Sequence, residues 1–411
     1  MSPAPQVLAH LIDVHCHPTD APTSSVESLP CTLCAMSTQA GDQSKVAALA
    51  RAHPDRIVPA FGYHPWWTHR ISLSAPAGSV PDSAAHYRAL FLPESSSSSS
   101  SPPPSTKLET AFARLLPFLP PPIALADVLA DVRARLTEFP SAMLGEVGID
   151  RVARVPFASP GTADDGNGND RGLLSPFLTP LAHQLAVLEA QLAIAVELRR
   201  NVSMHSVKAP SQTRALFDRM AEAHGAGWFA ISVDVHSCKF SPEVWREIGV
   251  RSFLHPLLHP FTSPNAGEDY LLMGASQRHH PNVYLSLSTA INGSIPNFIA
   301  LVRECAPTRL LVESDWPDAR DAPARTWDMA CMVAEIHDWP IEDAWEDTPP
   351  LDEGKWGVIR RLESNWRAFV KGGHVVPNQG LGSRERRRRD YSLDLVESSD
   401  TESEGEFKIS T

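Results

Sequence analysis

The sequence predicts an α/β protein in which eight strands alternate with helices and close into a TIM-type (β/α)8 barrel. Short apolar runs alternate with longer amphipathic stretches, which is the pattern of βα repetition. The number of apolar runs matches the number of strands in such a barrel. The predicted strands are Leu8–Val14, Thr32–Ser37, Ile57–Gly62, Ala142–Val147, Asn201–His205, Phe229–Val235, Val283–Ser288 and Arg309–Glu313.

The stretches between these runs have helical periodicity. The clearest is Pro180–Arg200, in which leucines and a valine recur every three or four residues and so share one face. These residues are Leu181, Leu185, Leu188, Leu192 and Val196.

Composition agrees with a globular α/β domain. The chain has 411 residues, of which 43% are hydrophobic and 20% are charged, enough for one large domain or two of ordinary size. The net charge of -12 argues against a broad basic surface for nucleic acid. It still permits a small basic groove, or an anionic substrate attracted by bound cations.

Three segments differ from the barrel domain, which we place at residues 8–375. Residues 94–104, ESSSSSSSPPP, and the glycine- and aspartate-rich residues 156–172 predict disordered or mobile loops. From residue 379 to 411 a basic run, RERRRR, precedes an acidic, serine-rich stretch, which predicts a disordered charged tail. The tail is a candidate for nuclear import and for binding protein partners.

Cysteines and hydropathy predict a soluble intracellular protein. The six cysteines are scattered, so reduced thiols are expected, and the Cys31-x-x-Cys34 pair lacks the second pair that a zinc module needs. The N-terminus has no signal-peptide pattern, and no apolar run approaches the ~20 residues of a membrane span. We expect a cytoplasmic or nuclear protein, or one found in both compartments.

Histidines and carboxylates follow the predicted strands. His15 and His17 end the first strand, where alternation points both imidazoles to the same side. Barrel active sites form at the C-terminal ends of strands, so two ring nitrogens there can bind one metal ion. His64 follows the third strand. It could donate a hydrogen bond to the substrate, or it could be a packed structural residue.

The other strand ends complete the pattern. Glu146 lies between apolar residues, and a buried carboxylate needs cations or donors nearby. His205 and His236 follow the fifth and sixth strands, and Asp315 follows the eighth. Taken singly, each histidine suits a core position equally well.

Together, His15, His17, Glu146, His205, His236 and Asp315 form a nitrogen–oxygen ligand set. Such a set suits Zn²⁺, Mn²⁺ or Mg²⁺, and imidazoles favour zinc or manganese. Two ions ~3.5–4 Å apart, bridged by Glu146, would hold an attacking water and stabilise charge on the scissile group. Asp315 can also accept a proton from that water.

The motifs IDVHCHP, FGYHP, LGEVGID, SMHS, DVHS and LLVESD resemble those of the TatD-like metal-dependent hydrolases, in the same order, from about Leu11 to Pro317. The resemblance implies a TIM barrel with divalent-metal-dependent deoxyribonuclease activity. It implies metal binding by the six residues named above, and contact between His64 and a substrate phosphate. The segment after Asp150 departs from the family pattern, and Trp316-Pro317 follows it only in part. The Ser/Pro insertion and the charged tail resemble those of fungal members.

We therefore predict hydrolysis of DNA phosphodiester bonds by a metal-bound hydroxide, with Asp315 and Glu146 as catalytic residues. The same ligand set suits hydrolysis of an amide or ester in a small substrate. A third hypothesis is an interaction protein that uses the barrel as a platform.

Overall fold

The computed structural model describes residues 3–21, 26, 29–92, 106–157, 174–249 and 280–377. All of these except Pro377 belong to one compact unit. The loop predicted at 94–104 and the tail predicted at 379–411 lie outside the described residues. So does the loop predicted at 156–172, except for its first two residues.

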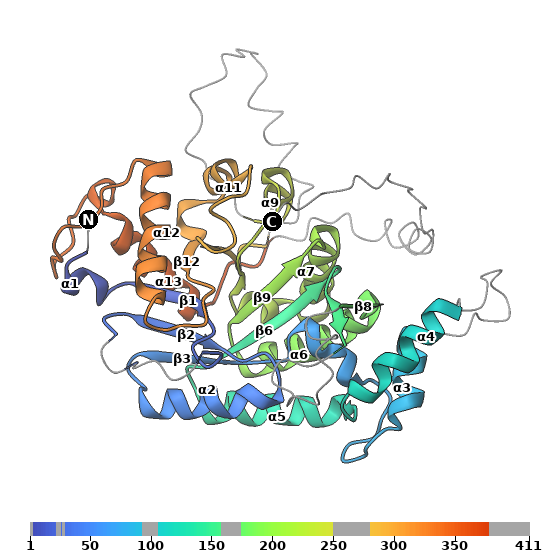
Figure 1. Ribbon diagram of the computed structural model, residues 1–411. Helices are drawn as coiled ribbons and strands as arrows, with labels where there is room; N and C mark the ends of the chain where they lie inside the picture. Colours follow the sequence, from blue (N-terminus) through green and yellow to red (C-terminus); the bar gives the residue numbers. More distant parts are fainter. Residues whose placement is uncertain are drawn as a thin grey trace, which may run out of the picture. The chain divides into compact units, whose positions relative to one another are not determined.

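Eight parallel strands follow one another around the sheet, which confirms the predicted barrel (Figure 1). Each strand hydrogen-bonds to the next along the chain, with helices on the outside. In order, the strands are β1 (Ile12–Cys16), β2 (Thr32–Met36), β3 (Ile57–Phe61), β6 (Met143–Asp150), β9 (Val202–Val207), β10 (Val233–Val235), β11 (Val283–Ser288) and β12 (Leu310–Glu313).

The barrel closes just beyond the end of β12. The Asp315 amide donates to the His15 carbonyl at 3.0 Å, and the His17 amide donates to the Trp316 carbonyl at 3.0 Å. The buried carboxylate of Asp13 accepts from the Ser314 amide, also at 3.0 Å. These bonds join the first and last strands at the end where the candidate ligands lie.

The covering helices follow the strands in the order expected of a βα repeat. They are α2 (Ala40–Ala52), α5 (Leu125–Glu138), α6 (Leu181–Leu198), α7 (Pro210–His224), α8 (Ala226–Phe229), α9 (Pro242–Ile248), α11 (Phe298–Glu304), α12 (Ala322–His337) and α13 (Val358–Lys371), with short 3-10 segments η4 (Pro307–Arg309) and η5 (Glu353–Lys355). A large apolar cluster lies between these helices and the strands.

Two predicted strands began too early. Residues Pro5–Leu8 form helix α1, with proline at its first position, where the missing N–H costs nothing. Strand β1 therefore starts at Ile12 rather than Leu8. Similarly, Phe229 ends helix α8, and β10 starts at Val233.

Helix α6, predicted at Pro180–Arg200, is long and apolar enough by length and composition to cross a membrane. Here it packs against the barrel through two buried glutamines. Gln184 bonds to the amide and carbonyl of Asp150, and Gln191 bonds to the amide and carbonyl of Tyr63. Its apolar composition is therefore that of a helix packed between strands and neighbouring helices.

A separate apolar cluster, here called the satellite core, lies beside the barrel. Its members are Tyr87, Phe91, Leu92, Phe112, Leu115, Val155, Phe157 and Phe177. They come mainly from α3 (Ser83–Phe91), α4 (Thr106–Leu115) and the antiparallel pair β7 (Arg154–Pro156) and β8 (Leu174–Leu178). The first two residues of the predicted 156–172 loop are therefore ordered, because Pro156 ends β7 and Phe157 is buried.

Two further short pieces connect α3 and α4 to the barrel. Strand β4 (Ile71–Ser72) pairs with β5 (Ile123–Ala124). In the chain, the 3-10 helix η2 (Pro65–Arg70) precedes β4, and the 3-10 helix η3 (Leu116–Phe118) precedes β5. Helix η2 follows β3 directly and so starts at the end of the barrel that carries the candidate ligands.

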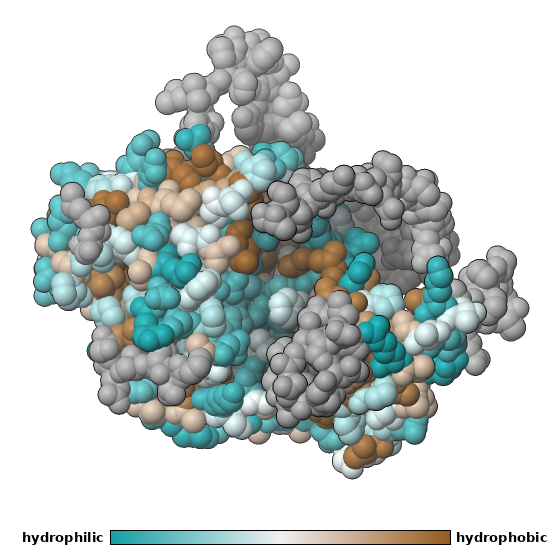
Figure 2. Space-filling view, viewed as in Figure 1, coloured by the Kyte–Doolittle hydropathy of each residue, from teal (hydrophilic) through white to brown (hydrophobic). Residues whose placement is uncertain are grey.

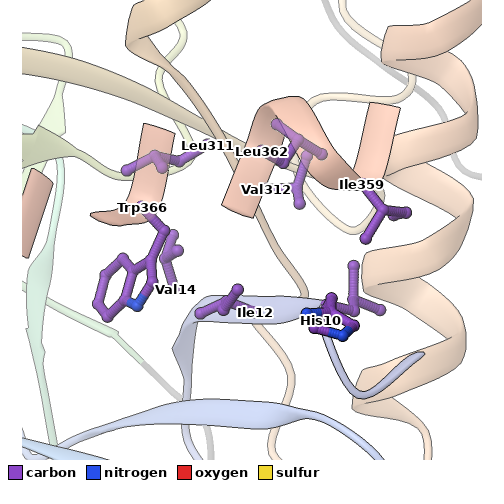
Figure 3. Close-up of a pocket in the computed structure, with 9 residues that line it drawn as sticks. His10, Ile12, Val14, Leu311, Val312, Ile359, Leu362 and Trp366 are labelled. Atoms are coloured by element: carbon purple, nitrogen blue, oxygen red, sulfur yellow. The ribbon is translucent and has the colours of Figure 1, made fainter. Parts of the chain in front are cut away.

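At β1, β12 and α13 the structure leaves a small apolar void of about 10 Å³ (Figure 3). Its lining includes His10 besides Ile12, Val14, Leu311 and Trp366. A volume of this size holds about one water molecule at most. We therefore regard the void as a feature of core packing.

Candidate metal centre

The six predicted ligands meet at the C-terminal end of the barrel. Five of them, with His64, line a pocket of about 1160 Å³, and His15 lies fully buried behind them. Figure 2 shows hydrophilic residues in the hollow at the centre of this face, with hydrophobic residues at its border. The sequence predicted only that these residues lie at strand ends. In the structure, the barrel brings their ring nitrogens and carboxylate oxygens together.

One group of atoms surrounds the Oε2 atom of Glu146. This oxygen lies 3.6 Å from His15 Nε2 and 3.4 Å from His17 Nε2. The two ring nitrogens are 3.2 Å apart. Asp315 Oδ1 completes the group at 3.9 Å from His15 Nε2 and 3.6 Å from His17 Nε2.

A second group surrounds the other carboxylate oxygen of Glu146. Oε1 lies 3.0 Å from His205 Nδ1, 2.7 Å from His236 Nε2 and 3.1 Å from His64 Nε2. His64 Nδ1 accepts from the Trp66 amide, so a neutral His64 ring carries its proton on Nε2. Glu146 therefore divides its two oxygens between the two groups.

The donor atoms fit divalent cations. Atoms that bind one ion at bond lengths of 2.0–2.2 Å lie about 3–3.5 Å from one another. The separations around the two Glu146 oxygens scatter around that range. In the described part of the chain, three overlapping sets converge closely enough to hold an ion: His15 with His236 and Asp315, His15 with His17 and Glu146, and His64 with Glu146 and His205.

Polar side chains behind the rings fix their orientation. Each of three candidate histidines turns its second nitrogen towards another polar group, an arrangement typical of metal-ligating histidines. His15 Nδ1 lies 2.7 Å from Ser203 Oγ, and His205 Nε2 lies 3.4 Å from Asp150 Oδ2. His236 Nδ1 faces Glu313 Oε1 at 3.7 Å, which is too long for a hydrogen bond.

The sequence alone did not reveal roles for Asp150, Ser203 or Glu313. A signal was available for Ser203, which precedes His205 by two residues in β9, because residues two positions apart on a strand point to the same side. Glu313 offered no such signal, because it ends β12 and Asp315 follows with a positive φ angle of 49°.

Burial and contacts within the site shift the pKa values of several of these groups. Burial would raise the pKa of Glu146, but His64, His236 and His15 outweigh it and hold that pKa well below its usual range. Burial lowers the pKa of His15 to about 3 and that of His64 to about 4. Glu146 is thus an anion and these two rings are neutral at pH 7.

His205 and His236 differ from His15 and His64. Burial would lower the pKa of His205, but its contacts with Asp150 and Glu146 outweigh the effect and raise that pKa. Burial would likewise lower the pKa of His236, but Glu146 and Glu313 raise it well above the usual value. A cation that enters the second group must therefore displace a proton from His236, as metal binding to histidine does in general.

The backbone at the rim bends through a conformation that L-residues rarely adopt. Lys208, Ser237 and Asp315, which follow β9, β10 and β12, have positive φ angles of 54°, 42° and 49°. Gly148 allows β6 to lie close to β9, because a Cβ at this position would be 2.0 Å from the His205 carbonyl oxygen. Such local strain is common at functional sites.

These features, together with the comparisons below, define the chain as a metal-dependent hydrolase built on a TIM barrel. The family model described as TatD related DNase matches residues 12–348. The chain therefore belongs to the TatD related DNase family, as the motif order predicted.

Two curated fungal proteins are similar over nearly their whole length. Cut9-interacting protein scn1 of Schizosaccharomyces pombe is 28% identical over 368 residues, covering 88% of this chain and 98% of scn1. Uncharacterized deoxyribonuclease YMR262W of Saccharomyces cerevisiae is 24% identical over 379 residues, covering 88% of this chain and 99% of that protein.

Two solved structures are also similar. The TatD homologue YjjV from Escherichia coli K12 is 15% identical, with a TM-score of 0.46, and the match covers 89% of this chain and 98% of YjjV. An uncharacterized amidohydrolase from Saccharomyces cerevisiae is 12% identical, with a TM-score of 0.44, and the match covers 82% and 88% of the two chains.

Proposed function

We propose that this protein is a deoxyribonuclease that hydrolyses DNA phosphodiester bonds with two divalent ions, Zn²⁺, Mn²⁺ or Mg²⁺. The observation that carries the proposal is the position of Glu146, whose two oxygens face two adjoining groups of nitrogen and oxygen donors. His236, in the second group, also lies close to His15 and Asp315 of the first. One carboxylate between two such groups is suited to bridging a pair of ions. Family membership supports DNA as the substrate.

We assign His15, His17, Glu146 and Asp315 to one ion, and Glu146, His205 and His236 to the other. When bound, the ions would lower the pKa of water and neutralise charge on the phosphate. Asp315 lies at the edge of the pocket, with a side chain that is 17% exposed. Its carboxylate is thus placed to accept a proton from the attacking water.

His64 would contact the substrate phosphate. Its Nε2 proton points into the pocket wall, where Glu146 Oε1 accepts it at 3.1 Å. We propose that, when Glu146 binds cations, His64 Nε2 donates its hydrogen bond to a phosphate oxygen instead. The pKa of about 4 keeps the ring neutral at physiological pH, so its contribution is a hydrogen bond rather than a charge.

Two lysines add positive charge near the candidate ligands. Lys208 and Lys239 each stand three residues after a candidate histidine, in the repeated pattern His-Ser-x-Lys, and both line the pocket. Exposed lysines there would attract DNA phosphates despite the net charge of -12. Lys45 also lines the pocket, where the carboxylates of Asp20, Asp42, Glu146, Asp150 and Asp315 outnumber the three lysines until cations bind.

The test combines metal content with cleavage of single- and double-stranded DNA, for the wild type, Glu146→Ala and Glu138→Ala. Glu138 is an exposed residue at the end of α5 and serves as the control. We expect about two ions and DNA cleavage in the wild type and in Glu138→Ala, with both lost in Glu146→Ala. Cleavage that persists in Glu146→Ala would contradict the proposal.

The same assay separates the alternative substrate class. Small amide and ester substrates are included, because a water molecule activated by bound cations would attack many electrophiles. If the protein binds metal and hydrolyses these substrates but not DNA, the metal site is supported. The substrate is then an amide or ester rather than DNA. Protein binding through the tail is a separate hypothesis, because residues 379–411 lie outside the described part of the chain.

A further inference from the structure

Trp66 is unusually exposed for a residue next to the candidate metal centre. It belongs to η2, directly after β3, and lines the pocket. Its side chain is 51% exposed, whereas the preceding His64 is 3% exposed. Leaving an indole in water forgoes the stabilisation that burial of so large an apolar surface would bring.

Trp66 is also fixed in place. Its Nε1 donates a hydrogen bond to Asp150 Oδ2 at 2.8 Å. The ring stands nearly perpendicular to His64, with centroids 4.8 Å apart, and lies 6.3 Å from the ring of His205. An oriented, half-exposed aromatic ring therefore stands beside the second group of ligands.

We propose that Trp66 stacks on the base of the nucleotide next to the scissile phosphate, an inference that rests on the proposed deoxyribonuclease function. A base and its phosphate are joined through one sugar, so a ring beside the ligands can meet the base nearest the reacting group. Aromatic side chains bind bases of any sequence in this way, because every base has a flat π-face.

Stacking also defines the form of the substrate. A base inside a duplex is already covered by its neighbours and must leave the stack before a side chain can cover it. Trp66 therefore favours an unpaired nucleotide at the site. We expect single-stranded or frayed ends to be cleaved faster than the interior of a duplex.

The experiment compares kcat/KM for the wild type, Trp66→Ala, Trp66→Phe and Trp345→Ala. Phenylalanine keeps a flat ring but loses the bond to Asp150. Trp345 stacks on His10, outside the residues that line the pocket, and serves as the control. The substrates are a single-stranded oligonucleotide and the same oligonucleotide with an abasic nucleotide at the cleaved position.

We expect Trp66→Ala to lose about tenfold or more in kcat/KM on the intact oligonucleotide, and little on the abasic one. Trp66→Phe should retain most of the activity on both, and Trp345→Ala should equal the wild type. An equal loss on both substrates would mean that Trp66 only supports the metal site, which would overturn the stacking inference.

A binding measurement separates this inference from the proposed function. Intrinsic fluorescence of a Glu146→Gln variant is titrated with the oligonucleotide, with and without Trp66→Phe. Stacking predicts quenching that disappears with Trp66→Phe. Such quenching without any DNA cleavage by the wild type would leave base binding intact and refute the nuclease proposal. DNA cleavage with neither quenching nor an effect of Trp66→Ala would refute stacking alone.

Discussion

Asp150 illustrates how a single residue can control a site without binding the ion. It accepts hydrogen bonds from the Trp66 indole and from the amides of Val152 and Ala153, so its carboxylate has a fixed orientation. That carboxylate faces His205 Nε2 at 3.4 Å. A proton held on Nε2 leaves Nδ1 free to bind a metal, since a neutral ring carries only one proton.

The change Asp150→Asn tests this role. The amide group would present a donor to both the Trp66 indole and His205, which favours the ring form with the proton on Nδ1. We expect metal affinity to fall roughly 10- to 100-fold, measured by competition titration with a chelating dye. Asp55→Asn, an exposed position in a turn, is the control. Unchanged affinity in Asp150→Asn would show that His205 is oriented by other groups.

At the scale of elements, the satellite core is independent of the barrel core. Phe177 of β8 stacks on Phe91 of α3 with ring centroids 5.2 Å apart and meets Phe112 of α4 edge-on at 6.3 Å. The cluster forms a group separate from the main apolar core. Its elements can therefore lose their packing while the barrel keeps its own.

Replacing the central ring should reveal that independence. Phe177→Ala removes a buried aromatic side chain, which typically costs about 3–5 kcal/mol. We expect faster hydrogen exchange in α3 and α4, with unchanged exchange in β9 and β11. The neighbouring Leu178→Ala is a matched control, because Leu178 lies on the exposed face of β8. Equal acceleration in the barrel strands would show that the two cores unfold together.

At the scale of the whole molecule, stability depends on pH through histidines outside the site. Burial lowers the pKa of His69 to about 3, with a further contribution from Arg70. An unfolded chain binds a proton at this position below pH ~6.5, whereas the folded chain does not. The unfolded state is therefore favoured progressively as the pH falls from about 6.5 towards 3.

His69→Gln should reduce this dependence, because glutamine does not titrate and can still donate a hydrogen bond. Between pH 7 and pH 5, the wild type should lose about 2 kcal/mol more unfolding free energy than His69→Gln, measured by urea denaturation. His53→Gln, at a partly exposed position after α2, is the control. Parallel pH curves for the wild type and His69→Gln would contradict the assignment.

Much of the fold follows from local sequence. The alternation of apolar runs and helical stretches identified the eight barrel strands, because burial on both faces requires a short continuous apolar run. Errors arose where local chemistry competed with hydropathy. Leu8 is apolar, yet Pro5 starts a helix there, and Phe229 packs at the end of α8 rather than in a strand.

Local sequence was enough to predict the barrel and the family, and to propose six ligands, because each of them lies within or just after an apolar run that forms a strand. How those residues meet depends on the tertiary structure. It split the oxygens of Glu146 between two groups, placed Asp150 and Glu313 behind the histidines, and left Trp66 exposed beside them. These relations join residues from different strands, so their distances are set by barrel closure, which no local pattern encodes.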